Sequence, residues 1–442
     1  MAEQQSENQW LDSGIAQMAA TLQGSSILAI AAQVRALVAS GKQVSNLTIG
    51  DFDPKEYPLP QKLVDGTIDA LKAGHTNYPP ANGIPELRSA VQQMYRERCG
   101  LELPVERILI AGGARPLLYG AYRALVNPGE KVLYSVPSWN NNHYVHLTEA
   151  VGVEIEVGPE DNFFPTLARL APHLQDAALI VLNSPQNPSG TCIDEGTLRE
   201  LCEAIVVENQ RRKTVNQRPL MMIYDQIYWM LTFGTTAHVD PLRVHPGMAE
   251  YVVYIDGISK AFAATGLRVG WSIGPARVID AMSKIIGHVG AWAPKPEQVA
   301  TAGLLRDPAA VDAYLKFIRP AAEKRLQLLH HGLAALAKQG LPVRSLQPQG
   351  AIYLSAEFAL RGWKDGDRAL KTADDVRKWL LDEAGLAMVP FDAFGTQHAV
   401  DWYRLSVGAI SVADVEKLLT RLGQVMSRLR LDSSQSPIRG AA

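Results

Sequence analysis

The sequence predicts an α/β protein with a mixed, mostly parallel β-sheet that is covered by helices on both faces. Between about residues 107 and 274, short runs rich in Val, Ile and Leu alternate with longer segments of helical periodicity. This alternation is typical of βαβ units, in which helices connect the strands of a buried sheet. The expected strands are Arg107–Ala111, Lys131–Ser135, Val153–Val157, Ala178–Asn183, Leu220–Tyr224, Tyr251–Asp256 and Arg268–Ile273.

After Pro294 the pattern changes to helices and short strands, which predicts a second, smaller α+β domain. A long amphipathic helix is expected from about Pro308 to Lys338, and short strands near Ala351–Leu354 and Tyr403–Val407. The charged segment Glu208–Arg218 is expected to be a solvated loop. The predicted organisation is an N-terminal arm with part of the small domain (1–50), a large domain (51–305), a small C-terminal domain (306–432) and a disordered tail (433–442).

Composition excludes several classes of protein. The 442 residues are 47% hydrophobic and 20% charged, as in globular proteins, and the net charge of −2 without a long basic run argues against a nucleic-acid partner. The three cysteines lack CxxC spacing, which argues against a disulfide framework or a zinc site, and the ten histidines suggest no metal site. Neither a signal peptide nor an apolar stretch long enough for a membrane span is found, so a cytoplasmic protein is expected.

The strongest chemical signal lies just after the expected strand Tyr251–Asp256. Lys260 follows this strand, and Arg268 comes eight residues later in a segment that contains several glycines. Ligands of such sheets bind beyond the carboxyl ends of the strands, where a lysine is a candidate Schiff-base nucleophile. An arginine nearby can bind a phosphate in a forked geometry. A lysine at the start of a loop is more often solvated surface, so this signal needs support from the rest of the chain.

That support comes from a family resemblance. The run Gly257-Ile-Ser-Lys-Ala-Phe-Ala-Ala-Thr-Gly-Leu-Arg-Val-Gly270 resembles the lysine motif of class I aminotransferases, which are fold type I enzymes dependent on pyridoxal 5'-phosphate (PLP). The prokaryotic aspartate-aminotransferase-like branch is the most similar, and the resemblance extends from about Leu47 to Val407 in matching order. It implies that Lys260 forms the Schiff base with PLP and that Arg268 binds the cofactor phosphate.

The resemblance assigns further cofactor contacts. Asp225 and Tyr228, in Tyr-Asp-Gln-Ile-Tyr, would contact the pyridine nitrogen and the phenolic oxygen of PLP, respectively, and both would take part in catalysis with Lys260. Asn187, in Asn-Pro-Ser-Gly, would contact the same oxygen and the substrate, although the motif alone also fits a plain turn. Trp139 would stack on the ring and border the substrate, whereas a core tryptophan is the simpler explanation.

Other matches concern the phosphate, the substrate and a second subunit. Gly113 and Ala114 precede an expected helix whose N-terminal N–H groups suit a phosphate. Tyr78 resembles the tyrosine that reaches the phosphate of the neighbouring subunit, which implies a homodimer with shared active sites. Arg404 matches the arginine that binds the substrate α-carboxylate, with Gly50 as a backbone contact. The joint occurrence of these residues in order is far more specific than any single match.

The resemblance implies an aminotransferase that moves an amino group from an L-amino acid to a 2-oxo acid by ping-pong kinetics, with Lys260 as proton shuttle. Two alternatives share the scaffold. One is a PLP-dependent lyase, for example one that catalyses β-elimination from a sulfur amino acid, and the other is a non-catalytic PLP-binding sensor. A lyase would release ammonia without an acceptor.

Several positions depart from the aspartate-specific pattern. Ala114 stands where this branch carries a lysine for the distal carboxylate of the substrate, and Arg115 is expected to point away from the site. Ile352, Phe391 and Gln226 replace other residues of the family and are expected to lie where the donor side chain is selected. These changes leave the donor class open among acidic, apolar and aromatic amino acids.

Overall fold

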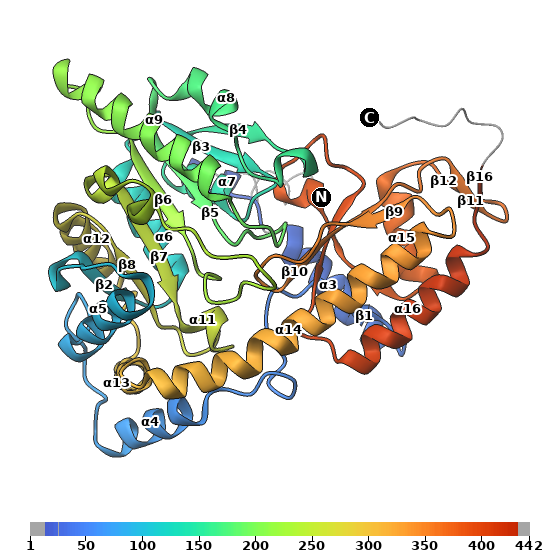
Figure 1. Ribbon diagram of the computed structural model, residues 1–442, viewed down its shortest axis with the longest axis horizontal. Helices are drawn as coiled ribbons and strands as arrows, with labels where there is room; N and C mark the ends of the chain where they lie inside the picture. The colour runs from blue at the N-terminus through green and yellow to red at the C-terminus, as the bar shows by residue number, and fades with distance from the viewer. Residues whose placement is uncertain (1–13, 25, 432–442) are drawn as a thin grey trace.

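A seven-stranded sheet forms the centre of the computed structural model, which describes residues 14–24 and 26–431 (Figure 1). The strand order is β2-β8-β7-β6-β5-β3-β4; β8 is antiparallel to both neighbours, and the other pairs are parallel. The strands are β2 (Ile108–Ala111), β3 (Lys131–Val136), β4 (Val151–Glu156), β5 (Ala177–Asn183), β6 (Met221–Asp225), β7 (Val252–Gly257) and β8 (Gly270–Ile273). Each lies within two residues of its expected range, so the prediction of a mixed, mostly parallel sheet is confirmed.

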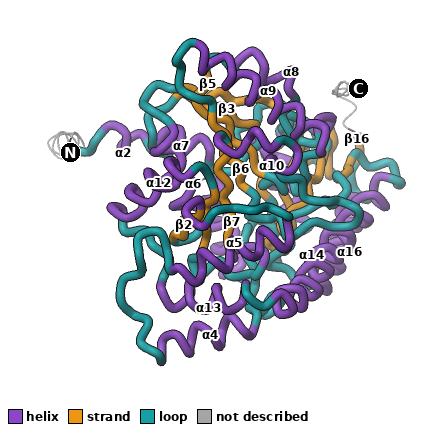
Figure 2. Tube along the Cα trace, turned by 60° about the vertical axis from the view of Figure 1, so that its left-hand side comes forward, coloured by secondary structure: helices purple, strands orange, loops and turns teal. Residues whose placement is uncertain are grey.

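Helices cover both faces of this sheet, and two separate hydrophobic cores result (Figure 2). Strand β2 shows the alternation that separates them: Ile108 and Ile110 belong to one core, and Leu109 and Ala111 to the other. One layer contains α6 (Ala114–Leu125), α7 (Asn141–Leu147) and α12 (Ala276–Val289), and the other contains α4 (Gln61–Lys72), α5 (Pro85–Cys99), α9 (Glu195–Thr214) and α13 (Lys295–Leu305).

The C-terminal third has its own small sheet, with the order β14-β15-β10-β9, and all its pairs are antiparallel. The long helix expected near 308–338 is α14 (Pro308–Ala337), which runs from beside α13 to the C-terminal elements (Figure 1). The other elements of this part are β9 (Val343–Ser345), β10 (Tyr353–Phe358), β11 (Trp363–Asp365), β12 (Arg368–Leu370), α15 (Ala373–Glu383), β13 (Leu386–Ala387), β14 (Val389–Pro390), β15 (Trp402–Ser406), α16 (Val412–Met426) and β16 (Arg430–Leu431).

The N-terminal segment joins the C-terminal part, because β1 (Ser45–Asn46) pairs in parallel with β13. The domain boundaries at residues 50, 305 and 432 stay a prediction, and the expected disordered tail, 433–442, lies outside the described residues. The remaining helices are short apart from α3: α2 (Gln17–Thr21), α3 (Ser26–Ala39), α8 (Leu167–Leu170), α10 (Pro241–Val244) and α11 (Ile258–Ala261). Within 14–24 and 26–431, no helix is long and apolar enough to cross a bilayer.

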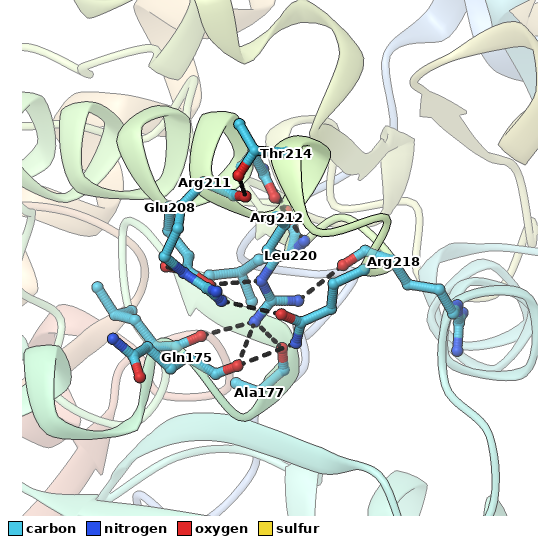
Figure 3. Close-up of polar contacts among 11 residues, drawn as sticks. Gln175, Ala177, Glu208, Arg211, Arg212, Thr214, Arg218 and Leu220 are labelled. Carbon is cyan, nitrogen blue, oxygen red and sulfur yellow. Dashed lines mark hydrogen bonds and ion pairs between the residues drawn. The ribbon is translucent and has the colours of Figure 1, made fainter.

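The prediction of a solvated loop at Glu208–Arg218 is wrong for residues 208–214, whereas residues 215–218 are exposed and non-helical as expected. Residues 208–214 form the last turns of α9, and Arg212 is buried beneath them (Figure 3). Its Nη2 donates hydrogen bonds of 2.7 Å to the carbonyl oxygens of both Leu174 and Ala177, and its Nε donates to Glu208. Backbone carbonyls beside the start of β5 need donors once they are buried, and Arg212 supplies them. A charged sequence therefore serves as an internal support of the sheet.

Candidate active site

A cavity of about 390 Å³ lies beyond the carboxyl ends of β5, β6 and β7. This is the position at which open α/β sheets bind ligands. Most of the site residues expected from the sequence line it: Gly50, Ala114, Trp139, Asn187, Asp225, Tyr228, Lys260, Arg268 and Arg404. The fold thus brings together residues that are up to 354 positions apart in the chain.

Lys260 lies on the single-turn helix α11, which directly follows β7. Its Nζ donates a hydrogen bond of 2.6 Å to the backbone oxygen of Gly50 and lies over the rings of Phe52 and Tyr228. Burial lowers the pKa of this amine to about 8, and Asp51 opposes the change. Near neutral pH, the neutral and nucleophilic form of the amine is therefore more populated at Lys260 than at an ordinary lysine.

Asp225 is the last residue of β6, and its partly buried carboxyl group lines the cavity. Oδ1 accepts a hydrogen bond of 3.1 Å from the backbone N–H of Ile227, and within the described chain no lysine or arginine forms an ion pair with it. Burial raises the pKa of Asp225 to about 7, against the effects of that N–H and of Lys260. A protonated ring nitrogen placed against this carboxylate would supply the positive charge that the group lacks.

Arg404 comes from β15 of the small sheet and is 1% exposed. Its Nη1 donates to Oδ1 of Asn187 at 2.9 Å, and its Nη2 donates to the backbone oxygen of Thr48 at 2.7 Å. Nε is buried and has no hydrogen-bond partner among the described residues. The guanidinium is also stacked between the rings of Tyr353 and Phe394. A buried guanidinium without a carboxylate partner is suited to binding the carboxylate of a ligand.

A second positively charged region lies next to the start of α6, where the Arg268 side chain packs against Gly113. The Arg268 guanidinium donates to the backbone oxygens of Thr265 and Gly112 at 2.7 and 3.0 Å, and it has no ion-pair partner among residues 14–24 and 26–431. Gly113 has φ +92°, and a Cβ there would lie 2.6 Å from Nη2 of Arg268. Only glycine therefore fits between the guanidinium and the helix N-terminus, where N–H groups favour an anion. Gly113 itself does not line the cavity.

Arg115 does not point away from the site, so that expectation is wrong. Its guanidinium carbon lies 5.0 Å from the centre of the Trp139 ring, and both side chains line the cavity. The stacking on a flat aromatic ring holds the cation in the cavity without a carboxylate. Arg115 is the second residue of α6, and the direction of its side chain depends on the residue at which the helix begins. The sequence does not define that residue exactly, so it could not predict the direction.

The three substitutions expected near the donor side chain do not line the cavity. Ile352 is fully buried, and Phe391 packs edge-on against Phe163 at 5.2 Å. Gln226 is also fully buried, and its Nε2 donates to the Tyr95 hydroxyl. The prediction that these positions select the donor is therefore wrong, because each side chain is turned into the protein core.

Tyr353 is a cavity residue that the sequence analysis missed. Its hydroxyl oxygen lies 2.7 Å from that of Tyr228, and a Cβ on Gly50 would collide with it at 2.7 Å. Tyr353 belongs to β10, which pairs with the strand of Arg404. The pairing of β10 with β15 is what brings Tyr353 to the site, and the sequence around this tyrosine does not reveal that pairing.

Tyr78 lies outside the cavity of its own chain. It is 82% exposed and contacts Trp292 edge-on at 5.3 Å. Interfaces between subunits are enriched in tyrosine.

We expect Asp225→Asn to stabilise the cofactor-free protein at pH 8. The pKa of Asp225 is about 7 in the folded protein and 3.8 for an ordinary aspartate. Between pH 3.8 and pH 7 the folded state therefore keeps a proton on this carboxyl group that the unfolded state has released. Stability therefore falls as pH rises through this range, and the loss is complete above pH 7. Thermal unfolding should show a midpoint a few degrees higher for the variant at pH 8 and a difference that narrows toward pH 4.

The control is Asp280→Asn, because Asp280 is an exposed carboxylate that pairs with Lys284 on α12. This change should leave the midpoint nearly unaltered at both pH values. An Asp225→Asn protein that is equally or less stable than the wild type at pH 8 would contradict the burial argument.

Comparisons with known proteins identify the family. The family described as aminotransferase class I and II matches residues 42–422. The aspartate aminotransferase of Rhizobium meliloti is 29% identical, over 92% of this chain and 94% of its own length. The aspartate/prephenate aminotransferase of Thermus thermophilus is 30% identical, over 94% of this chain and 99% of its own length.

Solved structures agree with these matches. The aspartate aminotransferase from Rhizobium meliloti superposes with a TM-score of 0.84 at 27% identity, covering 94% of this chain and 99% of that one. The Thermus thermophilus aspartate aminotransferase with maleate gives 0.81 at 28% identity, covering 93% and 99%. The fold is therefore the expected fold type I architecture, and the chain belongs to the class I and II aminotransferases.

Proposed function

We propose that this aminotransferase uses PLP to transfer the amino group of an L-amino acid to a 2-oxo acid by a ping-pong mechanism. The observation that carries the proposal is one cavity that holds the amine of Lys260, the partly buried carboxylate of Asp225 and the buried guanidinium of Arg404. These groups are complementary to an aldehyde carbon, a protonated ring nitrogen and a substrate carboxylate, respectively.

The residues present fit PLP. When bound, PLP supplies an aldehyde carbon that condenses with amines and a ring that takes up the electron pair freed at a substrate α-carbon. Among the described residues neither Arg268 nor Asp225 has an ion-pair partner; the Arg268 cation beside Gly113 fits the phosphate, and the Asp225 carboxylate fits the ring nitrogen. We assign the cofactor to Gly113, Ala114, Trp139, Asn187, Asp225, Tyr228, Lys260, Arg268 and, across a dimer, Tyr78.

The chain's own groups then bind the donor and move its proton. Arg404 binds the α-carboxylate, with Gly50, Trp139 and Asn187 around it. Lys260 Nζ, once neutral, would accept the α-proton and, as an ammonium group, would donate it to the carbon derived from the aldehyde of PLP rather than back to the α-carbon. Its lowered pKa of about 8 keeps both protonation states accessible near neutral pH.

The position of Arg115 supports an acidic donor. A carboxylate at the far end of aspartate or glutamate would pair with this guanidinium, which the stacking on Trp139 holds in the cavity. One similar solved structure, the aspartate aminotransferase of Thermus thermophilus, is described as being with maleate, which is a dicarboxylate. Arg115 would then take the place of the cation that Ala114 cannot provide.

The test is the visible absorption spectrum of the purified protein with PLP and a panel of amino acids but no acceptor. We expect a yellow band that bleaches with aspartate or glutamate and returns when a 2-oxo acid is added. A band that converts only with aromatic or aliphatic donors would overturn the acidic-donor assignment. A protein that never binds PLP would overturn the whole proposal.

Neither alternative considered for this scaffold gains support. The relatives that match nearly the whole chain are named as aminotransferases, and no observation favours β-elimination or a non-catalytic sensor. The same spectra separate these reactions, because a lyase would release ammonia and an oxo acid without an acceptor.

We also propose a homodimer in which Tyr78 of each subunit completes the cavity of the other; its 82% exposure supports this role. Mixing a Tyr78→Ala protein with a Lys260→Ala protein should then restore activity. Random exchange of subunits makes half of the dimers hybrids, and each hybrid has one intact site of its two. About one quarter of the wild-type activity is therefore expected.

The control is each variant mixed with itself under the same conditions, which should recover nothing. Cross-linking or light scattering on the same samples reports whether subunits exchanged. Exchange without recovery would show that Tyr78 acts within its own chain or not at all.

A cytoplasmic location is a further part of the proposal. The cysteines Cys99, Cys192 and Cys202 are free and buried, and burial raises the pKa of each thiol to about 12. Such thiols are compatible with a reducing compartment. Cell fractionation with detection of the protein tests this location.

A further inference from the structure

A buried polar cluster lies behind the active site, on the opposite face of the sheet. Its centre is Asp256, in β7, which is 1% exposed and does not line the cavity. Neighbouring strand residues point to opposite faces, so Ile255 packs in the core beside α6 while Asp256 points toward α5. Within the described residues, no lysine or arginine forms an ion pair with this carboxylate.

Three donors converge on Asp256. Oδ1 accepts from the backbone N–H of Gly257 at 2.7 Å, and Oδ2 accepts from Tyr95 Oη at 2.7 Å and from Trp229 Nε1 at 2.8 Å. The Tyr95 hydroxyl in turn accepts from Gln226 Nε2 at 2.8 Å. All of these side chains are buried. We refer to Asp256, Tyr95, Trp229 and Gln226 as the Asp256 cluster.

The donors come from segments that carry the proposed catalytic residues. Trp229 directly follows Tyr228, and Gln226 directly follows Asp225. Gly257 ends β7 three residues before Lys260. Gly257 is itself confined, because a Cβ there would lie 2.7 Å from the backbone oxygen of Val269. One carboxylate thus connects the loop after β6 with the turn that presents the lysine.

We propose that Asp256 is a positioning residue, which fixes the position of the turn that carries Lys260 relative to the loop that carries Asp225 and Tyr228. This inference rests on the proposed roles of those three residues and adds a role for residues outside the cavity. The hydrogen bonds run in one direction, from Gln226 through Tyr95 to Asp256, which accepts them as a carboxylate. An asparagine at 256 has one acceptor oxygen and one NH2 group, so at least one of the three donors would face another donor.

The test compares Asp256→Asn with Asp240→Asn. Asp240 is also a buried carboxyl group, and it likewise accepts from a tyrosine hydroxyl (Tyr254, 2.8 Å) and from backbone N–H groups, but those groups belong to α10. All of these hydrogen bonds are accepted by Oδ1, and Oδ2 has no partner among the described residues. Asp240 is therefore a control for a buried carboxyl group that shares β7 with Asp256 through Tyr254 but whose backbone donors lie outside the cavity.

We expect Asp256→Asn to lower kcat about 10- to 100-fold while KM changes less than about threefold, because the chemistry is misaligned but Arg404 is untouched. The absorption maximum and spectral pKa of lysine-bound PLP should shift, and amide hydrogen exchange across residues 257–262 should accelerate. Asp240→Asn should keep kcat within about twofold, because the asparagine oxygen can keep the hydrogen bonds that Oδ1 accepts. Asp256→Glu should restore part of kcat, since it retains two acceptor oxygens.

An Asp256→Asn protein with wild-type kcat, spectrum and exchange, changed only in thermal midpoint, would overturn the inference. If this variant does not fold, Tyr95→Phe removes only the hydroxyl donor, and Trp229→Phe removes the indole N–H and leaves a smaller aromatic ring. Wild-type kcat and spectra in both variants would overturn the inference equally. A wild-type protein without a PLP band would overturn the proposed function itself, so the two failures are distinguishable.

Discussion

Lys260→Ala is expected to reduce turnover by more than about 10⁴-fold, and this is the largest effect that the site predicts. The substitution removes both the amine that anchors PLP covalently and the base that moves the α-proton, and general acid–base catalysis by itself contributes about 10²- to 10⁴-fold. No other lysine lines the cavity in the described part of the chain, so no neighbour can take over either role.

The measurement is a steady-state assay with aspartate and 2-oxoglutarate, together with the visible spectrum of the variant incubated with PLP. We expect the band of lysine-bound PLP to be absent, while noncovalent binding through Arg268 persists. The control is Lys284→Ala, because Lys284 is 70% exposed on α12 and pairs with Asp280 of the same helix. A Lys260→Ala protein that still turns over would refute the assigned lysine.

Arg404→Lys is expected to lower kcat/KM for amino acids by roughly 30- to 900-fold, which corresponds to about 2–4 kcal/mol. Lysine keeps the positive charge but cannot form the two parallel hydrogen bonds that a guanidinium offers a carboxylate. It would also lose the contacts that Arg404 makes with Asn187 and Thr48, and its stacking between Tyr353 and Phe394.

The informative measurement is selectivity. Amines that lack the α-carboxylate should react with wild type and variant at similar rates, whereas amino acids should lose most of their advantage in the variant. Arg344→Lys is the control, because Arg344 lies in the same small sheet but is 62% exposed and pairs with Glu357. Unchanged selectivity in Arg404→Lys would mean that the substrate carboxylate binds elsewhere.

Much of the architecture was predictable because its signals are local. The strands of the large sheet are short apolar runs between helical segments, and every one lies within two residues of its expected place. The long helix α14 follows from one amphipathic pattern of 3.6-residue periodicity. The motif around Lys260 is also local, since the lysine, the turn and Arg268 lie within nine consecutive positions.

The errors and omissions concern burial and contacts between distant segments. Glu208–Arg218 is a charged run, yet Arg212 is buried because carbonyl oxygens some 35 to 38 residues away need its donors. Arg115 faces the cavity because Trp139, from another loop, offers it a ring. Tyr353 reaches the site only because its strand pairs with that of Arg404.

By itself, the sequence determined which segments become strands and helices and which residue types reach the carboxyl ends of the strands, because backbone propensity and hydrophobic periodicity act over a few neighbouring residues. Only the tertiary structure decided which groups are desolvated and which donors they find. The pKa of about 7 at Asp225, the unpaired Nε of Arg404 and the hydrogen bonds of Tyr95 and Trp229 to Asp256 all depend on contacts between segments far apart in the chain. Desolvation and hydrogen bonding depend on distances in space, and these are defined only once the chain has folded.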